Sequence, residues 1–146
     1  DTSYAFTYTG VEGLTASYGV GSNDDASGST SNADATTMSL AYAYGPVTVA
    51  YSDHEYDSNT ATEDLDVQSF KLSYTVSDAI SISYGEEEVD SGTTTDQDAK
   101  YTRLSASYTA GGMTVSGNMS EMENGDFSTT ASMDEEYVGL SVSFAF

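Results

Sequence analysis

The sequence has no cysteine, no tryptophan and one proline, and its three basic residues stand against 24 acidic ones, for a formal net charge of -21. Without cysteine the chain has neither disulfides nor thiolate chemistry. The scarcity of lysine and arginine argues against a nucleic-acid partner, because phosphate backbones are bound by clustered basic side chains. No apolar run approaches the roughly 20 residues of a membrane-spanning helix. The lack of such a run does not exclude a transmembrane β-barrel, because barrel strands alternate apolar and polar residues.

The 3.6-residue period of an amphipathic helix is also nearly absent, and a period of two runs along almost the whole chain instead. In the segment TMSLAYAY, for example, Met38, Leu40, Tyr42 and Tyr44 fall in one phase. This alternation predicts an all-β protein. Nine strands are expected, at residues 3–9, 14–20, 37–44, 47–53, 67–76, 79–85, 101–110, 113–119 and 137–146.

The connections between these segments alternate strictly in length. Tight turns are expected at GVEG, Gly45-Pro46, Ser77-Asp78 and Gly111-Gly112. The other connections are long and acidic, and hold most of the carboxylates: Asp24-Asp25, Glu63-Asp64, Glu86 to Glu88 and Asp134 to Glu136. Short turns at one end and long loops at the other are typical of an antiparallel transmembrane β-barrel. A soluble β-sandwich is the main structural alternative.

Aromatic residues of the apolar phase gather near both ends of the expected strands. Near the short turns they are Tyr8, Tyr44, Tyr74, Tyr108 and Phe144, and near the long loops Tyr18, Tyr51 and Tyr84. Two such rings are expected where the headgroups of a bilayer meet water. The pattern therefore favours the membrane barrel over the sandwich.

The count of nine strands is odd, whereas a closed antiparallel barrel of one chain normally has an even number. Unpaired strand edges in lipid are costly, since each unsatisfied peptide group costs several kcal/mol. We therefore expect residues 1–146 to be the C-terminal part of one β-barrel domain whose N-terminal strands are missing from this sequence. The alternative is that residues 3–9 form a plug, or that the sheet is smaller.

The last ten residues, YVGLSVSFAF, place Val138, Leu140, Val142, Phe144 and Phe146 in one phase. This segment resembles the C-terminal assembly signal of bacterial outer-membrane barrels, in which alternate residues are hydrophobic and the terminal residue is usually Phe. By that resemblance the assembly signal comprises Tyr137, Gly139, Val142, Phe144 and Phe146, and it is read by the barrel assembly machinery.

The segments TYTGVEGLTASYGVG and YAYGPVTVAYS resemble the C-terminal half of general porins of Gram-negative bacteria, in particular the alphaproteobacterial kind. The resemblance implies a 16-stranded barrel, a homotrimer in the bacterial outer membrane, in contact with lipid and lipopolysaccharide. It also implies passive diffusion of small hydrophilic solutes and ions through a water-filled channel, with no cofactor and no enzymatic activity.

The phase opposite the aromatic residues is expected to line the lumen. Its side chains are mostly short and polar, and the predicted pore-lining set is Lys71, Arg103, Ser69, Ser73, Ser81, Ser83, Ser105, Ser107, Ser116 and Asn118. A narrow barrel must fill its interior with side chains, which serine and alanine cannot do, so this wall favours a wide pore. Lys71 and Arg103 are the basic residues of this phase, and either tune ion selectivity or are simply solvated.

The acidic loops are expected to attract cations to the pore mouth and to give a preference for cations. Divalent ions have a possible bridging role there, but no loop has the spaced ligands of a calcium site, so no metal site is predicted. Asp53-His54-Glu55 is the nearest approach to a catalytic group, yet neighbours on a strand point to opposite faces, and no G-x-S-x-G motif is present. The functional alternative to a porin is a surface receptor or adhesin that acts through these loops.

Overall fold

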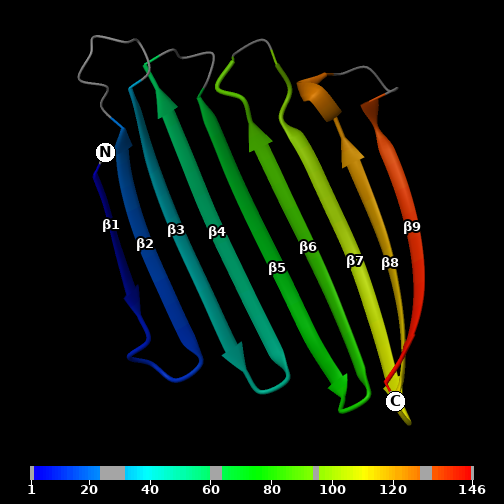
Figure 1. The fold of residues 1–146 in the computed structure, drawn as a ribbon. Helices are drawn as coiled ribbons and strands as arrows, with labels where there is room; N and C mark the ends of the chain where they lie inside the picture. The colour runs from blue at the N-terminus through cyan, green and yellow to red at the C-terminus, as the bar shows by residue number, and fades with distance from the viewer. Residues whose placement is uncertain (1, 24–31, 60–63, 94–95, 129–132, 146) are drawn as a thin grey trace.

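The computed structural model describes residues 2–23, 32–59, 64–93, 96–128 and 133–145. These residues form one antiparallel sheet of nine strands in sequence order, a single layer thick (Figure 1). The strands are β1 (Thr2–Tyr8), β2 (Leu14–Asn23), β3 (Ala33–Tyr44), β4 (Val47–Ser58), β5 (Leu65–Ser77), β6 (Ile80–Asp90), β7 (Ala99–Ala110), β8 (Met113–Glu123) and β9 (Glu135–Phe144). A short 3-10 helix, η2 (Gly125–Phe127), precedes β9. No helix among the described residues is long and apolar enough to cross a membrane.

The nine expected strands are all present, and every neighbouring pair is antiparallel. The two-residue connections lie together at one end of the sheet, and the opposite end carries the longer connections (Figure 1). Gly111 and Gly112 both have positive φ angles, of 57° and 81°, as the two central residues of a type I′ hairpin turn require. The turn expected at Ser77-Asp78 lies one residue later, because β5 extends to Ser77 after a register shift at Thr75.

The sheet has two chemically different faces because the side chains alternate along every strand. We call the face that carries Ser69, Lys71 and Ser73 the polar face, and the face that carries Phe70, Leu72 and Tyr74 the apolar face. The register keeps the phases together across the sheet, so that Lys71 pairs with Gly85 and Leu72 pairs with Tyr84.

The sheet encloses almost no core. Among the described residues the buried hydrophobic core consists of Ala99, whereas Leu140 is 79% and Val138 is 73% exposed. A soluble sandwich would cover such an apolar face with a second sheet. A contiguous apolar face of this size marks a surface that contacts protein or membrane.

The strands continue further into the acidic segments than the alternation of apolar residues suggested. Glu86 to Glu88, expected in a loop, belong to β6, and Glu135 and Glu136 belong to β9. The expectation was wrong because backbone ladder bonds form irrespective of side-chain polarity, so a strand continues past the end of its apolar stretch. Asp64 is described, and its carboxylate accepts a 2.8 Å bond from the Ser58 amide, whereas Asp24, Asp25 and Glu63 lie outside the described residues.

Two of the longer connections are tied to each other. The Asn124 side chain donates to the Asp98 carbonyl at 3.0 Å, and the Gln97 amide donates to the Phe127 carbonyl at 3.2 Å. The Asn124 amide also donates to the Asp134 carboxylate at 2.9 Å. These bonds hold the segment before β7 against the segment before β9.

Candidate functional site

The structure brings the predicted pore-lining residues together on the polar face of four adjacent strands, β5 to β8. Ladder pairing arranges them in rows that run across the strands. One row contains Ser73, Ser83, Ser105 and Asn118, and the next contains Ser81, Ser107 and Ser116. Lys71 and Arg103 share a third row, and Ser69 lies in the row beyond it.

Short hydroxyl side chains on this face bond to one another between strands. Ser81 and Ser107 are 2.7 Å apart, as are Ser116 and Ser141, and Thr109 and Thr114 are 2.9 Å apart. Such cross-strand pairs support the sheet. Each hydroxyl still has hydrogen-bonding capacity left for water. The polar face is therefore suited to contact with water from β6 to β9.

Lys71 and Arg103 lie on either side of Gly85, which is their common row neighbour on β6. Neither side chain forms an ion pair or hydrogen bond with another described residue, since the salt bridge among those residues joins Lys100 to Glu86. The Gly85 site is open, because an added Cβ would meet nothing closer than the Phe70 carbonyl oxygen at 3.8 Å. The two cations thus flank a space at Gly85 that no side chain of the described residues fills.

A hollow of about 620 Å³ lies at this place, and its lining includes Lys71, Gly85, Arg103, Glu87 and Glu135. Glu87 and Glu135 belong to the next row of the polar face. The Ser69 hydroxyl donates to the Glu87 carboxylate at 2.9 Å and orients it. A second hollow of about 190 Å³ lies among the serine rows and shares Arg103 with the first.

Sequence reasoning missed the two glutamates because it assigned them to loops. The signal was available, since Glu87 continues the phase of Ser81, Ser83 and Gly85. Glu135 likewise precedes Tyr137 by two residues and shares its phase. Counting the alternation past the last apolar residue of each strand finds both.

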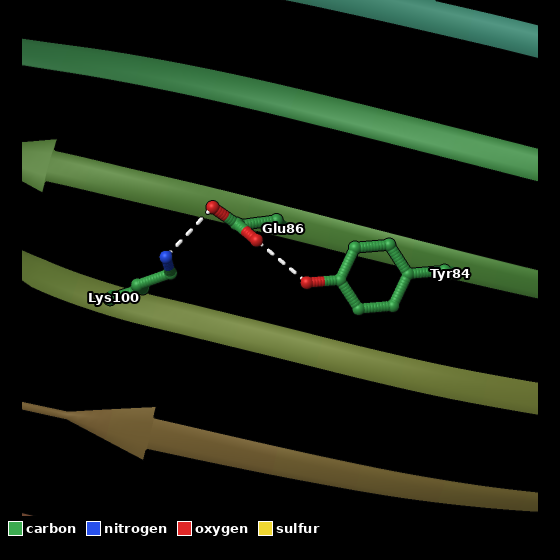
Figure 2. A network of polar contacts seen from close by, with 3 residues as sticks. All are labelled: Tyr84, Glu86 and Lys100. Carbon is green, nitrogen blue, oxygen red and sulfur yellow. Dashed lines mark hydrogen bonds and ion pairs between the residues drawn. The ribbon is translucent and has the colours of Figure 1, made fainter.

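A polar network of Tyr84, Glu86 and Lys100 lies at the border of the apolar face nearest the longer connections (Figure 2). The Tyr84 hydroxyl donates to the Glu86 carboxylate at 2.6 Å, and the Lys100 ammonium lies 2.9 Å from the other oxygen of that carboxylate. On β4 the Tyr51 hydroxyl donates to the Asp53 carboxylate at 3.0 Å in the same i, i+2 arrangement. Tyr51 on β4 and Tyr84 on β6 are therefore hydrogen-bonded to carboxylates at the end of the apolar face nearest the longer connections.

The segment that resembles an assembly signal is the edge strand β9. Val142 and Phe144 lie in the phase of the apolar face, and Phe146 lies outside the described residues. Tyr137 and Gly139 lie on the polar face. The Tyr137 ring covers Gly139, since an added Cβ there would be 2.9 Å from a ring carbon. The glycine therefore has a packing reason to be small.

Asp53 and His54 point to opposite faces and have separate partners. Asp53 accepts from Tyr51, whereas the His54 Nδ1 atom is 2.7 Å from the Thr37 hydroxyl. The two residues therefore do not form a catalytic pair, as their neighbouring positions on one strand predict. No group of metal-ligating side chains that could hold an ion occurs among the described residues.

Residues 1–126 match the Gram-negative porin family. The chain belongs to this family. Proteins of this family are typically trimeric, non-enzymatic diffusion channels of the outer membrane. A comparison with curated proteins found no match.

Solved porin structures share the fold. A mutant of the Rh. blastica porin superposes with a TM-score of 0.68 at 18% identity, covering 99% of this chain and 45% of that chain. A porin structure refined at 1.8 Å gives a TM-score of 0.69 at 19% identity, covering 96% of this chain and 50% of that chain. OmpT, an outer membrane protein of Vibrio cholerae, gives 0.53 at 17% identity, covering 82% of this chain and 44% of that one. The porin-family chain thus spans about half the length of these relatives, and its nine strands match about half of a porin barrel.

Proposed function

We propose that this chain contributes to the wall of a water-filled outer-membrane channel for the passive diffusion of small hydrophilic solutes and ions. The observation that carries the proposal is the contrast between the two faces of one sheet. The rows of Ser73, Ser83, Ser105 and Asn118 lie directly behind a face of exposed tyrosine, leucine and valine. Lipid suits the apolar face, and the polar face suits water.

The size of the polar side chains supports a wide lumen. A narrow barrel excludes water by packing large inward side chains. The polar face instead carries mostly serine, alanine and glycine along its middle rows, with Lys71 and Arg103 among them, and is hollowed at Gly85. We propose that the chain is the C-terminal part of one β-barrel domain, because β1 and β9 each have an edge that no other described strand pairs, and a closed barrel pairs such edges with further strands.

We propose a preference for cations at the mouth of this channel. The net charge of -21 and the carboxylates on the ends of β6 and β9 create a negative potential that concentrates cations. Lys71 and Arg103 oppose that potential deeper on the wall, so the pore combines an acidic entrance with a local basic site.

The partners are proposed from the family. They are a homotrimer of the whole porin, outer-membrane lipid and lipopolysaccharide around the apolar face, and the barrel assembly machinery acting on β9. Tyr137, Gly139, Val142 and Phe144 are the described residues of that assembly signal.

Planar-bilayer recording of the native protein tests the channel. Steady current steps that are proportional to voltage support a porin. Folded protein that inserts into the bilayer without conductance contradicts it and favours a receptor or adhesin that acts through the acidic loops.

A further inference from the structure

We propose that the hollow around Gly85 is a subsite on the channel wall that retains small zwitterions of about dipeptide length. This inference rests on the proposed channel function and adds to it a class of solute. The hollow measures about 620 Å³, within the range of small-molecule sites, which is roughly 300–1,000 Å³.

The basic side of the subsite is formed by Lys71 and Arg103. Their Cα atoms are about 10 Å apart, two strand spacings of ~4.8 Å each, because Gly85 lies between them in the ladder. Both side chains are exposed and neither pairs with another described residue. Long side chains on either side of an open glycine can converge on a single carboxylate, and such charge-assisted bonds are among the strong ones.

The acidic side lies in the adjacent row of the same face. Glu87 and Glu135 are placed there by the pairings of β6 with β7, β7 with β8 and β8 with β9. Ser69 fixes the Glu87 carboxylate by donating to one of its oxygens. Adjacent rows of one face are about 7 Å apart along the strand, since each residue rises ~3.3 Å.

That spacing selects a solute with opposite charges at its two ends. Two residues in an extended chain span about 7 Å at most, so the carboxylate and ammonium of a dipeptide match the two rows. Tyr101 lies in the acidic row of the same face, next to Glu87, and offers ring surface to the ammonium end. A simple anion would use the basic row alone and would meet repulsion from the acidic row.

Gly85 and Gly19 provide a matched pair of leucine variants. Gly85 has no positive φ, and its site is open, so Gly85→Leu fills the hollow without backbone strain. Gly19 also lies on the polar face without a positive φ, and an added Cβ there would meet nothing closer than 3.6 Å. Gly19→Leu is therefore the control for an added leucine elsewhere on this face.

The experiment measures single-channel current through the native protein as diglycine is added, with acetate and glycerol as probes of one charge and of none. Diglycine is expected to lower the current along a saturable curve, more strongly than either control probe. Gly85→Leu is expected to raise its half-saturating concentration about tenfold or more, since lost charge-assisted bonds cost that much, while Gly19→Leu leaves it unchanged. Lys71→Gln with Arg103→Gln provides a second test that does not depend on the folding of Gly85→Leu.

Three results overturn the subsite while the channel proposal stands. They are normal conductance with no saturable effect of diglycine, an effect of acetate as strong as that of diglycine, and an equal loss of the effect in Gly19→Leu and Gly85→Leu. Absence of any conductance overturns the channel itself, and the subsite with it.

Discussion

The Tyr137 ring lies over Gly139 so closely that an added Cβ at residue 139 would be 2.9 Å from Tyr137 Cε1 and 2.8 Å from Asn118 Oδ1. Gly139→Val must therefore displace the ring or shift β9 against β8. We expect the free energy of unfolding to fall by roughly 0.5–1.5 kcal/mol, the cost of moving a side chain off its preferred rotamer, because the close atoms belong to side chains and Tyr137 is 62% exposed. Denaturant unfolding of the native protein in detergent or lipid measures this. Gly19→Val is the control, because its Cβ has room, and equal effects of the two substitutions would contradict the packing account.

Reversing the charge of both wall cations, with Lys71→Glu and Arg103→Glu, is expected to increase the cation-to-anion permeability ratio severalfold. The reason is that rings of wall charge set the local concentration of permeant ions. Reversal potentials in a salt gradient give the ratio. Lys100→Glu makes the same kind of change on the apolar face, where Lys100 pairs with Glu86 outside the lumen, and should shift the ratio less. A shift of the same size in both proteins would remove Lys71 and Arg103 from the selectivity account.

The cation preference is expected to weaken as the salt concentration rises. The screening length is about 30 Å at 0.01 M and about 3 Å at 1 M, so the field of the acidic mouth acts on passing ions only in dilute salt. Permeability ratios measured across this range should approach those of free diffusion at the upper end. A permeability ratio that is independent of salt would mean that selectivity arises from close contacts within the pore. It would contradict a role for the field of the acidic mouth.

Tyr84→Phe removes the hydroxyl that donates to Glu86 at 2.6 Å. Because this bond holds the tyrosine at the border of the apolar face, its loss should lower the thermal unfolding midpoint of the protein in lipid. Tyr18→Phe is the matched control, since the Tyr18 hydroxyl has no hydrogen bond to another described residue. Equal midpoints for the two variants would show that the Glu86 bond contributes nothing to stability.

The strands and their two faces were predictable because alternation is a local signal. Phe70, Leu72 and Tyr74 lie in one phase in the sequence, and the register carries them onto one face. The ends of the strands were not predictable from apolar residues, and so Glu87 and Glu135 were assigned to loops. Bonds between distant segments, such as that from Asn124 to Asp98, leave no local pattern, because their partners are chosen by the fold.

The row arrangement of the wall needed the structure as well. The sequence places Lys71 and Arg103 in one phase, but only the ladder shows that Gly85 separates them and that Glu87 lies in the adjacent row. Register depends on turn geometry as well as on pattern, and the shift at Thr75 in β5 changes it by one residue. The sequence therefore predicted which residues line the wall. Their arrangement around the hollow follows only from the pairing of the strands.

Single-channel current through Ser105→Cys during exposure to a charged, membrane-impermeant thiol reagent tests the central claim most directly. Residues 1–146 contain no cysteine, so the introduced thiol is their one target, and the unsubstituted native protein exposed to the same reagent shows any effect of thiols elsewhere. Ser105 lies on the polar face, and its chain neighbour Leu104 lies on the apolar face, 48% exposed. We predict a stepwise change in current for Ser105→Cys and none for Leu104→Cys. A stepwise change in current for Leu104→Cys, with none for Ser105→Cys, would contradict the assignment of the polar face to the water-filled pore.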